Sequence, residues 1–328
     1  MSIQISGAFA KNISSAKLRL DVHQTITALA KAAIEISHLC ARGPLDTDFG
    51  SLAGSANSDG DAQKSLDVRT DEIITSALKG TPTAYYASEE QEGIVTLDRD
   101  KPLAVASDPL DGSSNIDTNV SIGTIFSIFK ARQTAEASFM RAGREQLVGG
   151  FFVYGPQTSL VITAGNGTEL YVLDREEGVF KLAIAKMHIP KDAHEYAINA
   201  SNFQSWHTPI RTYIEDCQLG AFGPLQRKQN MRWIGSLVAD ANRILMRGGI
   251  FLYPEDTRQG YENGRLRLLY EASPIAFIIE QAGGAATNGQ SRILDIELNT
   301  LHERVPLVFG SVYPVSQVKT YYQNQVDS

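Results

Sequence analysis

DPLDGSSNID, residues 108–117, is the segment around which the rest of the chain can be organised. It follows a short apolar run, Leu103–Ser107, which Pro102 precedes. A short apolar run bounded by a turn residue predicts a buried strand, and this strand would carry Asp108 at its C-terminal end. Open α/β sheets keep their ligand sites at the carboxyl ends of strands. The segment therefore predicts both a sheet and the place of a site.

The side chains of this segment predict a metal and phosphate site. Asp108 and Asp111 lie three residues apart in a rigid turn, and such carboxylates repel each other unless a cation lies between them. The nearby ligands are hard oxygens, including the Leu110 carbonyl, which favours magnesium or manganese over zinc. Backbone N–H groups and hydroxyls suited to a phosphate follow, on Gly112, Ser113 and Ser114. An Asx-turn that leads into a loop is the alternative.

The composition is that of an ordinary globular protein. The chain has 328 residues, 43% of them hydrophobic and 20% charged, and a formal net charge of −7. It contains no Lys/Arg run of the kind that binds nucleic acid or anionic membranes, so neither is expected as a partner. Cys40 and Cys217 lie far apart and outside any CxxC motif, which fits a reducing compartment. Because no stretch of about 18 apolar residues occurs, we expect a soluble cytoplasmic protein.

Two further pairs of acids lie near predicted element ends. Asp61 and Asp67 flank the start of a helix, and residues six apart on a helix do not share a face. If the two converge, Asp61 lies in the preceding loop; otherwise Asp61 caps the helix and Asp67 is a solvated acid of its first turn. Glu89 and Glu90 follow a predicted strand at residues 84–87 and form either a charged turn or further site residues. Three acidic pairs at such positions favour a metal site more than any single pair does.

Hydrophobic periodicity predicts the remaining elements. We expect a helix over residues 15–42, a meander of strands after the central segment, a helix over 234–246 and a strand over 250–253. The strands of the meander are predicted at residues 121–129, 147–154, 158–163, 170–173 and 179–182. Ser273-Pro274 is typical of an N-cap and first helical position. The polar interval 186–194 predicts a boundary between domains of residues 1–190 and 191–328.

Four segments together resemble the signatures of class I fructose-1,6-bisphosphatases. They are GDAQKSLD at 60–67, SEE at 88–90, DPLDGSSNID at 108–117 with VSIGTIFSI close behind, and GRLRLLYEASPIA at 264–276. The wider inositol monophosphatase-like relatives share only the shorter central motif and the preceding Glu. The resemblance implies an α/β fold, the sugar phosphatase fold, built as a layered α/β/α/β/α sandwich of two halves.

The resemblance also implies a role for each site residue. The implied metal ligands are Asp61, Glu89, Asp108, the Leu110 carbonyl, Asp111 and Glu271. The pair that orients and deprotonates the attacking water would be Asp67 and Glu90. The residues that match those binding the transferred phosphate in the family are Asp111, Gly112, Ser113 and Ser114. The residues that match those binding the distal phosphate and the sugar are Asn199, Arg232, Tyr253 and Arg265.

The implied reaction is the Mg²⁺-dependent hydrolysis of the 1-phosphate of D-fructose 1,6-bisphosphate, in gluconeogenesis or the Calvin cycle. The resemblance implies two or more Mg²⁺ ions per subunit, with Mn²⁺ as an alternative ion. It also implies a homo-oligomer, a homotetramer, in which Arg232 reaches the distal phosphate of a neighbouring subunit. The other hypotheses are a dual enzyme that also accepts sedoheptulose 1,7-bisphosphate, an inositol monophosphatase-like enzyme and an inactive sugar-phosphate sensor. The sensor would be expected to lack at least one acid, and all of them are present.

The chain departs from the family pattern at several positions. Arg265 replaces a Lys, and Asn202 and Trp233 replace tyrosines, which leaves the preferred sugar bisphosphate open. Many relatives bind AMP through a Gly- and Thr-bearing turn, a Lys-Tyr pair and an Arg. The matching positions here are residues 14–21, Pro102-Leu103 and Lys130. We therefore expect activity that is insensitive to AMP.

Overall fold

The computed structural model describes residues 2–5, 9–45, 52–56 and 62–326. The helices are α1 (Ala16–Arg42), α2 (Ser65–Leu78), α3 (Ala135–Phe139), α4 (Thr208–Leu219), α5 (Leu237–Arg247), α6 (Ser273–Gln281) and α7 (Val312–Val326). The strands of the first half are β1 (Leu52–Ala56), β2 (Ala62–Lys64), β3 (Thr83–Ser88), β4 (Val95–Thr96), β5 (Leu103–Asp111), β6 (Ile122–Lys130), β7 (Val148–Tyr154), β8 (Thr158–Thr163), β9 (Thr168–Asp174) and β10 (Val179–Ile184). Those of the second half are β11 (Glu195–Ala197), β12 (Asn230–Met231), β13 (Ile250–Tyr253), β14 (Leu266–Arg267), β15 (Ala285–Thr287), β16 (Arg304–Val305) and β17 (Leu307–Gly310). None of the helices in the described ranges is long and apolar enough to cross a membrane.

An eight-stranded sheet has the order β10-β9-β8-β7-β6-β5-β3-β4. The strands β6 to β10 pair antiparallel with their successive neighbours, which confirms the predicted meander. β3 and β5 run parallel, so their carboxyl ends meet at the same edge of the sheet. There the N–H of Glu89, just after β3, donates to the Ser107 carbonyl of β5 (3.0 Å). The pairing of β3 and β5 therefore places the second acidic pair beside the central segment.

β5 is longer than the predicted strand at residues 103–107 and passes through both Asp108 and Asp111. Its pairing with β6 shifts register between these two acids. Pro109 has no N–H to offer the ladder at this point, and the N–H of Leu110 donates instead to Asp108 Oδ1 (2.9 Å). The strand therefore does not end at Asp108 as expected but continues to Asp111, and the irregularity between the two acids changes the direction of their side chains.

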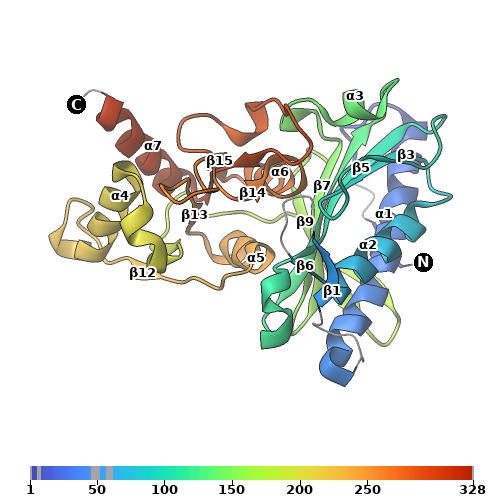
Figure 1. Ribbon diagram of the computed structural model, residues 1–328, viewed down its shortest axis with the longest axis horizontal. Coiled ribbons are helices and arrows are strands. Elements are labelled where there is room, and N and C mark those ends of the chain that lie inside the picture. Colours follow the sequence, from blue (N-terminus) through green and yellow to red (C-terminus); the bar gives the residue numbers. More distant parts are fainter. Residues whose placement is uncertain (1, 6–8, 46–51, 57–61, 327–328) are drawn as a thin grey trace.

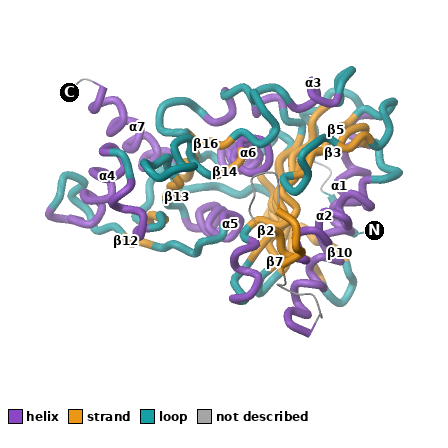
Figure 2. The backbone as a smooth tube through the Cα atoms, viewed as in Figure 1, coloured by secondary structure: helices purple, strands orange, loops and turns teal. Residues whose placement is uncertain are grey.

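The elements stack in five layers, as Figures 1 and 2 show. α1 and α2 cover one face of the eight-stranded sheet, α5 and α6 lie between its other face and a five-stranded sheet, and α4 and α7 cover the far side. The five-stranded sheet has the order β12-β11-β13-β17-β15. Residues of β6 alternate between the layers: Phe126 packs in the cluster of α1 and α2, and Ile125 packs in that of α5 and α6. The α/β/α/β/α sandwich is thus confirmed.

The helix α2 begins between positions 61 and 67, as expected, whereas two other predicted element starts differ from the structure. α2 starts at Ser65, after a short strand, β2, that was not predicted. α5 begins at Leu237 rather than at residue 234, since Gly235 has a φ of +83°, outside the helical region. Ser273 is not an N-cap, because a π-helical turn over Leu268–Ala272 leads directly into α6. The domain boundary at residue 190 stays a prediction.

Candidate active site

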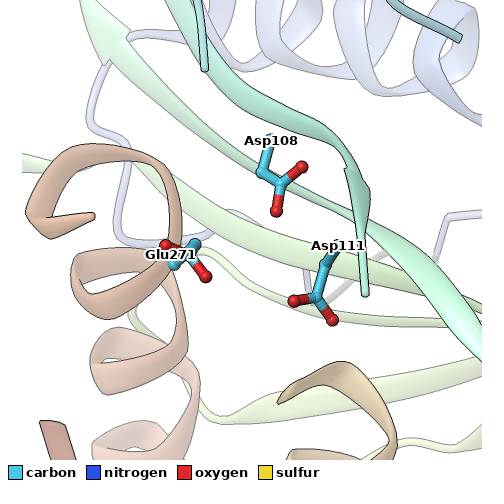
Figure 3. A group of neighbouring side chains, drawn as sticks. All are labelled: Asp108, Asp111 and Glu271. Carbon is cyan, nitrogen blue, oxygen red and sulfur yellow. The ribbon is translucent and has the colours of Figure 1, made fainter. Parts of the chain in front are cut away.

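Asp108, Asp111 and Glu271 converge at the carboxyl end of β5. One carboxylate oxygen from each lies within 4.8 Å of the others, and all three residues are buried. Figure 3 shows the three carboxylates facing a common space between β5 and the helical segment that carries Glu271. Buried carboxylates are rare in proteins unless they are paired or bind a cation, so this donor set fits a hard metal ion.

Asp111 is held by the start of α5. The N–H of Val238, in the first turn of that helix, donates to Asp111 Oδ2 (3.0 Å). α5 can approach this closely because Gly123 of β6, the register partner of Asp111, has no side chain. A Cβ at Gly123 would lie 2.7 Å from a methyl carbon of Val238 and 2.1 Å from the Phe152 carbonyl oxygen. The glycine therefore lets the helix start meet the acidic cluster.

Glu271 reaches the cluster from the π-helical turn that precedes α6. The backbone N–H of Arg267 donates a hydrogen bond to Glu271 Oε2 (2.5 Å). This bond ties the glutamate side chain to the backbone just before the turn. Single π-helical turns widen a helix locally and often occur at functional sites. The turn therefore sets the direction in which Glu271 projects.

Burial and mutual repulsion make the cluster electrostatically unfavourable without a cation. Burial, followed by the charges of neighbouring acids, raises the pKa of both Glu89 and Asp108 well above the usual range. Burial also raises the pKa of Asp111 to about 6, although its bond from Val238 acts in the opposite direction. Burial and then the charge of Asp111 raise the pKa of Glu271 to about 8. A bound divalent cation would favour the charged form of every one of these groups.

The predicted residues Glu89, Glu90 and Asp67 lie around the cluster. Asp67 is 3% exposed and lies in the first turn of α2. The charges of Asp67 and Glu90 both contribute to the raised pKa of Glu89, so the structure brings these three acids within electrostatic reach of one another. Asp67 is therefore not the solvated acid of the alternative interpretation. Asp61 lies outside the described residues.

A buried arginine that the sequence reasoning did not single out lies against Glu89. Arg267 is 3% exposed, and its Nε lies 3.5 Å from Glu89 Oε1. The sequence signal was an arginine between two leucines in a segment otherwise rich in apolar residues. Such a segment is expected to be buried, and an arginine is rarely buried without a partner. Its charge partly offsets the excess of acids.

The segment predicted to hold a phosphate forms a tight turn beside the start of α5. Gly112 has a φ of +82° and precedes a 3₁₀ helix over Ser113–Thr118. Asn115 Nδ2 donates to the Gly235 carbonyl (2.8 Å), which ties this turn to the loop before α5. Ser236, which the sequence reasoning also missed, places its hydroxyl 3.5 Å from the Cβ position of Gly112. That hydroxyl is buried and has no hydrogen-bond partner among the described residues.

Two residues predicted at the distal end lie near Glu271. The positive charge of Arg265 acts to lower the pKa of both Glu271 and Tyr253. The negative charge of Glu271 acts to raise the pKa of Tyr253. Arg265 is exposed and lies over the Tyr261 ring, 5.5 Å from its centroid. The structure therefore brings Arg265 and Tyr253 into the surroundings of the acidic cluster.

The other two distal residues make contacts within the second half of the chain. Asn199 lines a small pocket together with Tyr253, and its Oδ1 caps the 3₁₀ helix over Ala200–Ser205. Arg232 is exposed, and its Nε donates to Glu195 Oε1 (2.9 Å). Within the described residues, no hydrogen bond or ion pair joins Arg232 to the acidic cluster.

Comparisons with known proteins agree over nearly the whole chain. The family model described as Fructose-1-6-bisphosphatase, N-terminal domain, matches residues 9–185, and that described as Fructose-1-6-bisphosphatase, C-terminal domain, matches residues 189–323. A class 1 fructose-1,6-bisphosphatase of Nitrobacter hamburgensis is 56% identical over 302 residues, which are 92% of this chain and 87% of that protein. One from Rhizobium meliloti is 53% identical over 309 residues, 93% of this chain and 88% of that protein.

A solved structure supports the same assignment. The crystal structure of Leishmania major fructose-1,6-bisphosphatase in holo form matches with a TM-score of 0.88 and 32% identity, covering 98% of this chain and 100% of that one. Sequence, fold and acidic cluster therefore agree, and the chain belongs to the class 1 fructose-1,6-bisphosphatase family of phosphoric monoester hydrolases.

Proposed function

We propose that the acidic cluster is the centre at which this chain hydrolyses the 1-phosphate of D-fructose 1,6-bisphosphate, yielding fructose 6-phosphate and phosphate. The observation that supports this most directly is the convergence of three buried carboxylates from two segments far apart in the sequence: Asp108 and Asp111 of β5, and Glu271 of the π-helical turn. Phosphate monoester hydrolysis is among the slowest uncatalysed reactions, and enzymes accelerate it largely by stabilising charge.

The cluster suits Mg²⁺, two or more ions per subunit, with Mn²⁺ as an alternative. The proposed ligands are Asp61, Glu89, Asp108, the Leu110 carbonyl, Asp111 and Glu271. A divalent cation bound there supplies positive charge to the phosphoryl oxygens and lowers the pKa of a coordinated water. The oxygen-only donor set and the raised pKa values of the buried acids support this assignment.

Asp67 and Glu90 orient the attacking water and accept its proton. Asp67 is buried in the first turn of α2, where its carboxylate is kept from bulk water and lies within electrostatic reach of Glu89. The turn at residues 112–114 binds the transferred phosphate through backbone N–H groups and the hydroxyls of Ser113 and Ser114. These roles separate proton transfer from phosphate binding.

The distal phosphate and the sugar are held by Asn199, Arg232, Tyr253 and Arg265. The position of Arg265 and Tyr253 near Glu271 supports this for two of them. Arg265 can form two parallel bonds to a phosphate, which the family's Lys cannot. Arg232 contacts Glu195 at the surface, which is compatible with a role in a neighbouring subunit's site. We therefore propose a homotetramer with shared sites, built of subunits that divide near residue 190.

The test is phosphate release from a panel of substrates in the presence of Mg²⁺. The panel contains fructose 1,6-bisphosphate, fructose 1-phosphate, sedoheptulose 1,7-bisphosphate and inositol 1-phosphate. We expect the highest kcat/KM for fructose 1,6-bisphosphate. Comparable turnover of the sedoheptulose ester would show a dual enzyme, and preferential turnover of inositol 1-phosphate would contradict the proposal. Light scattering at assay concentration checks the tetramer, and an active monomer would exclude shared sites.

A further inference from the structure

Four polar side chains connect the elements that carry the acids of the site. Asp71 of α2 accepts a hydrogen bond from Tyr86 of β3 (Oη to Oδ1, 3.0 Å) and one from Gln91, just after β3 (Nε2 to Oδ2, 2.5 Å). Tyr86 Oη also lies 2.8 Å from the hydroxyl of Ser107 on β5. All but Gln91 are buried, and Tyr86 is fully so. One helix and two neighbouring strands are therefore joined around a single carboxylate.

The chemistry of these groups fixes the direction of the hydrogen bonds. An ionised carboxylate can only accept, so the single proton of the Tyr86 hydroxyl is donated to Asp71. Tyr86 Oη must then accept the proton of the Ser107 hydroxyl. Burial raises the pKa of Tyr86 well above its usual value, which keeps the phenol protonated. The donors and acceptors therefore form one directed chain from Ser107 through Tyr86 to Asp71.

Three of the four members of this network are close in sequence to a residue of the proposed site. Asp71 follows Asp67 by one helical turn, so the two side chains project from the same face of α2. Ser107 immediately precedes Asp108, and its carbonyl accepts the N–H of Glu89. Gln91 follows Glu90 directly. The bond from Tyr86 to Asp71 therefore limits rotation of α2 relative to β3 and β5, and with it movement of Asp67.

We propose that Tyr86 and Asp71 are positioning residues, whose hydrogen bond fixes α2 against β3 and β5 and so sets the position of Asp67 relative to Glu89. This inference rests on the proposed function, in which Asp67 acts on the attacking water. Misplacement of a catalytic group by about 1 Å can cost on the order of 100-fold in rate. The network contacts neither phosphate subsite, so its loss acts on turnover rather than on substrate binding.

The test is Tyr86→Phe, compared with a matched control, Tyr171→Phe. Tyr171 is also a fully buried tyrosine of the same sheet and core cluster, and its hydroxyl is bonded to the carboxylate of Glu169. We expect Tyr86→Phe to lower kcat for fructose 1,6-bisphosphate by about 10- to 100-fold. The KM and the Mg²⁺ concentration for half-maximal activity should stay within about twofold of the wild-type values. Tyr171→Phe should lower Tm to a similar extent and leave kcat unchanged.

A readout that does not depend on activity is amide hydrogen exchange in α2. Exchange over the first turns of α2 should be faster in Tyr86→Phe than in wild type and unchanged in Tyr171→Phe. Asp71→Asn gives a second variant, because the amide can still accept from Tyr86 and bond to a rotated Gln91. It should retain more activity than Asp71→Leu.

The outcomes separate this inference from the proposed function. If wild type does not hydrolyse fructose 1,6-bisphosphate, or if Asp67→Asn retains full turnover, the proposed function fails. If Asp67→Asn is inactive but Tyr86→Phe keeps wild-type kcat and wild-type exchange in α2, only the positioning role is overturned. Equal losses of kcat in Tyr86→Phe and Tyr171→Phe would indicate a general stability effect and would also overturn it.

Discussion

The backbone N–H of Val238 donates to Asp111 Oδ2 at 3.0 Å, which joins the first turn of α5 to the buried acidic cluster. A helix N-terminus carries partial positive charge, so this contact favours the ionised form of Asp111. It opposes burial, which still raises the pKa of Asp111 to about 6. The start of α5 thus partly offsets the negative charge of one acid of the cluster. The repulsion that remains among the acids favours the binding of a cation.

Removal of divalent metal should abolish activity, and Asp111→Asn should do the same in its presence. The reason is that Asp111 is one of the proposed oxygen ligands of the cation, in a cluster of three carboxylates that could hold a metal ion. We expect phosphate release to fall by more than about 100-fold in either case. The variant should keep a Tm near or above that of the metal-free wild type, because a repelling charge has been removed. Full turnover after exhaustive chelation would contradict the mechanism.

Asp67→Asn should separate proton transfer from metal binding. Asp67 is not one of the three clustered carboxylates, and its charge contributes to the raised pKa of Glu89. We expect kcat to fall by about 100- to 10,000-fold, while the stabilisation of the folded protein by Mg²⁺ or Mn²⁺ is retained. Thermal unfolding with and without metal checks this. If Asp67→Asn lost the metal-induced shift in Tm as completely as Asp111→Asn, the two roles would not be distinct.

The metal-free protein should lose stability as the pH rises from about 4.5 to 8. Burial and the charge of Asp111 raise the pKa of Glu271 to about 8 in the folded chain, from an ordinary value near 4.5. Over this window the folded state holds a proton that the unfolded state has released, so the free energy of unfolding falls with increasing pH. For one such proton the slope is about 1.4 kcal/mol per pH unit. Saturating Mg²⁺ should flatten the dependence of Tm on pH, and a metal-free Tm that rises from pH 5 to 8 would contradict the raised pKa.

Gly123→Ala should disturb both stability and activity. A Cβ at this position meets a methyl group of Val238 and the Phe152 carbonyl, so α5 must move away from β6 and from Asp111. Overpacking of this kind costs about 1–3 kcal/mol. Gly93→Ala is the control, because a Cβ at Gly93 has nothing within 4 Å. Denaturant unfolding and kcat measure the two effects; wild-type values for Gly123→Ala would show that the close approach of α5 is not required.

AMP should not inhibit the enzyme at physiological concentrations. The Ser15 hydroxyl already accepts the N–H of Leu18 at the start of α1, and Asp21 adds a buried negative charge in the same helix. Lys130 offers one point charge in place of an arginine fork. Each lost charge-assisted bond to a phosphate is worth about 1.5–3 kcal/mol, so nucleotide affinity falls by orders of magnitude. Steady-state assays over a range of AMP concentrations check this, and cooperative micromolar inhibition would reveal a site built from other residues.

The sequence by itself determined the local pattern of this protein and the chemistry of its ligands. Apolar runs at residues 121–129 and in the segments that follow, with turn residues between them, were sufficient for the meander, because short apolar runs bounded by turn residues predict successive strands. The spacing of the acids and the absence of nearby His or Cys selected hard oxygen ligands. The roles of individual site residues came from resemblance to a family, and not from spacing.

Only the tertiary structure decided how these parts meet. Glu271 joins Asp108 and Asp111 because α6 packs between two sheets, and a local pattern carries no information about such a contact. The π-helical turn at Leu268–Ala272 and the shifted register of β5 were likewise missed. Each is a departure from regular hydrogen bonding that packing around the site stabilises, whereas periodicity describes only the regular elements.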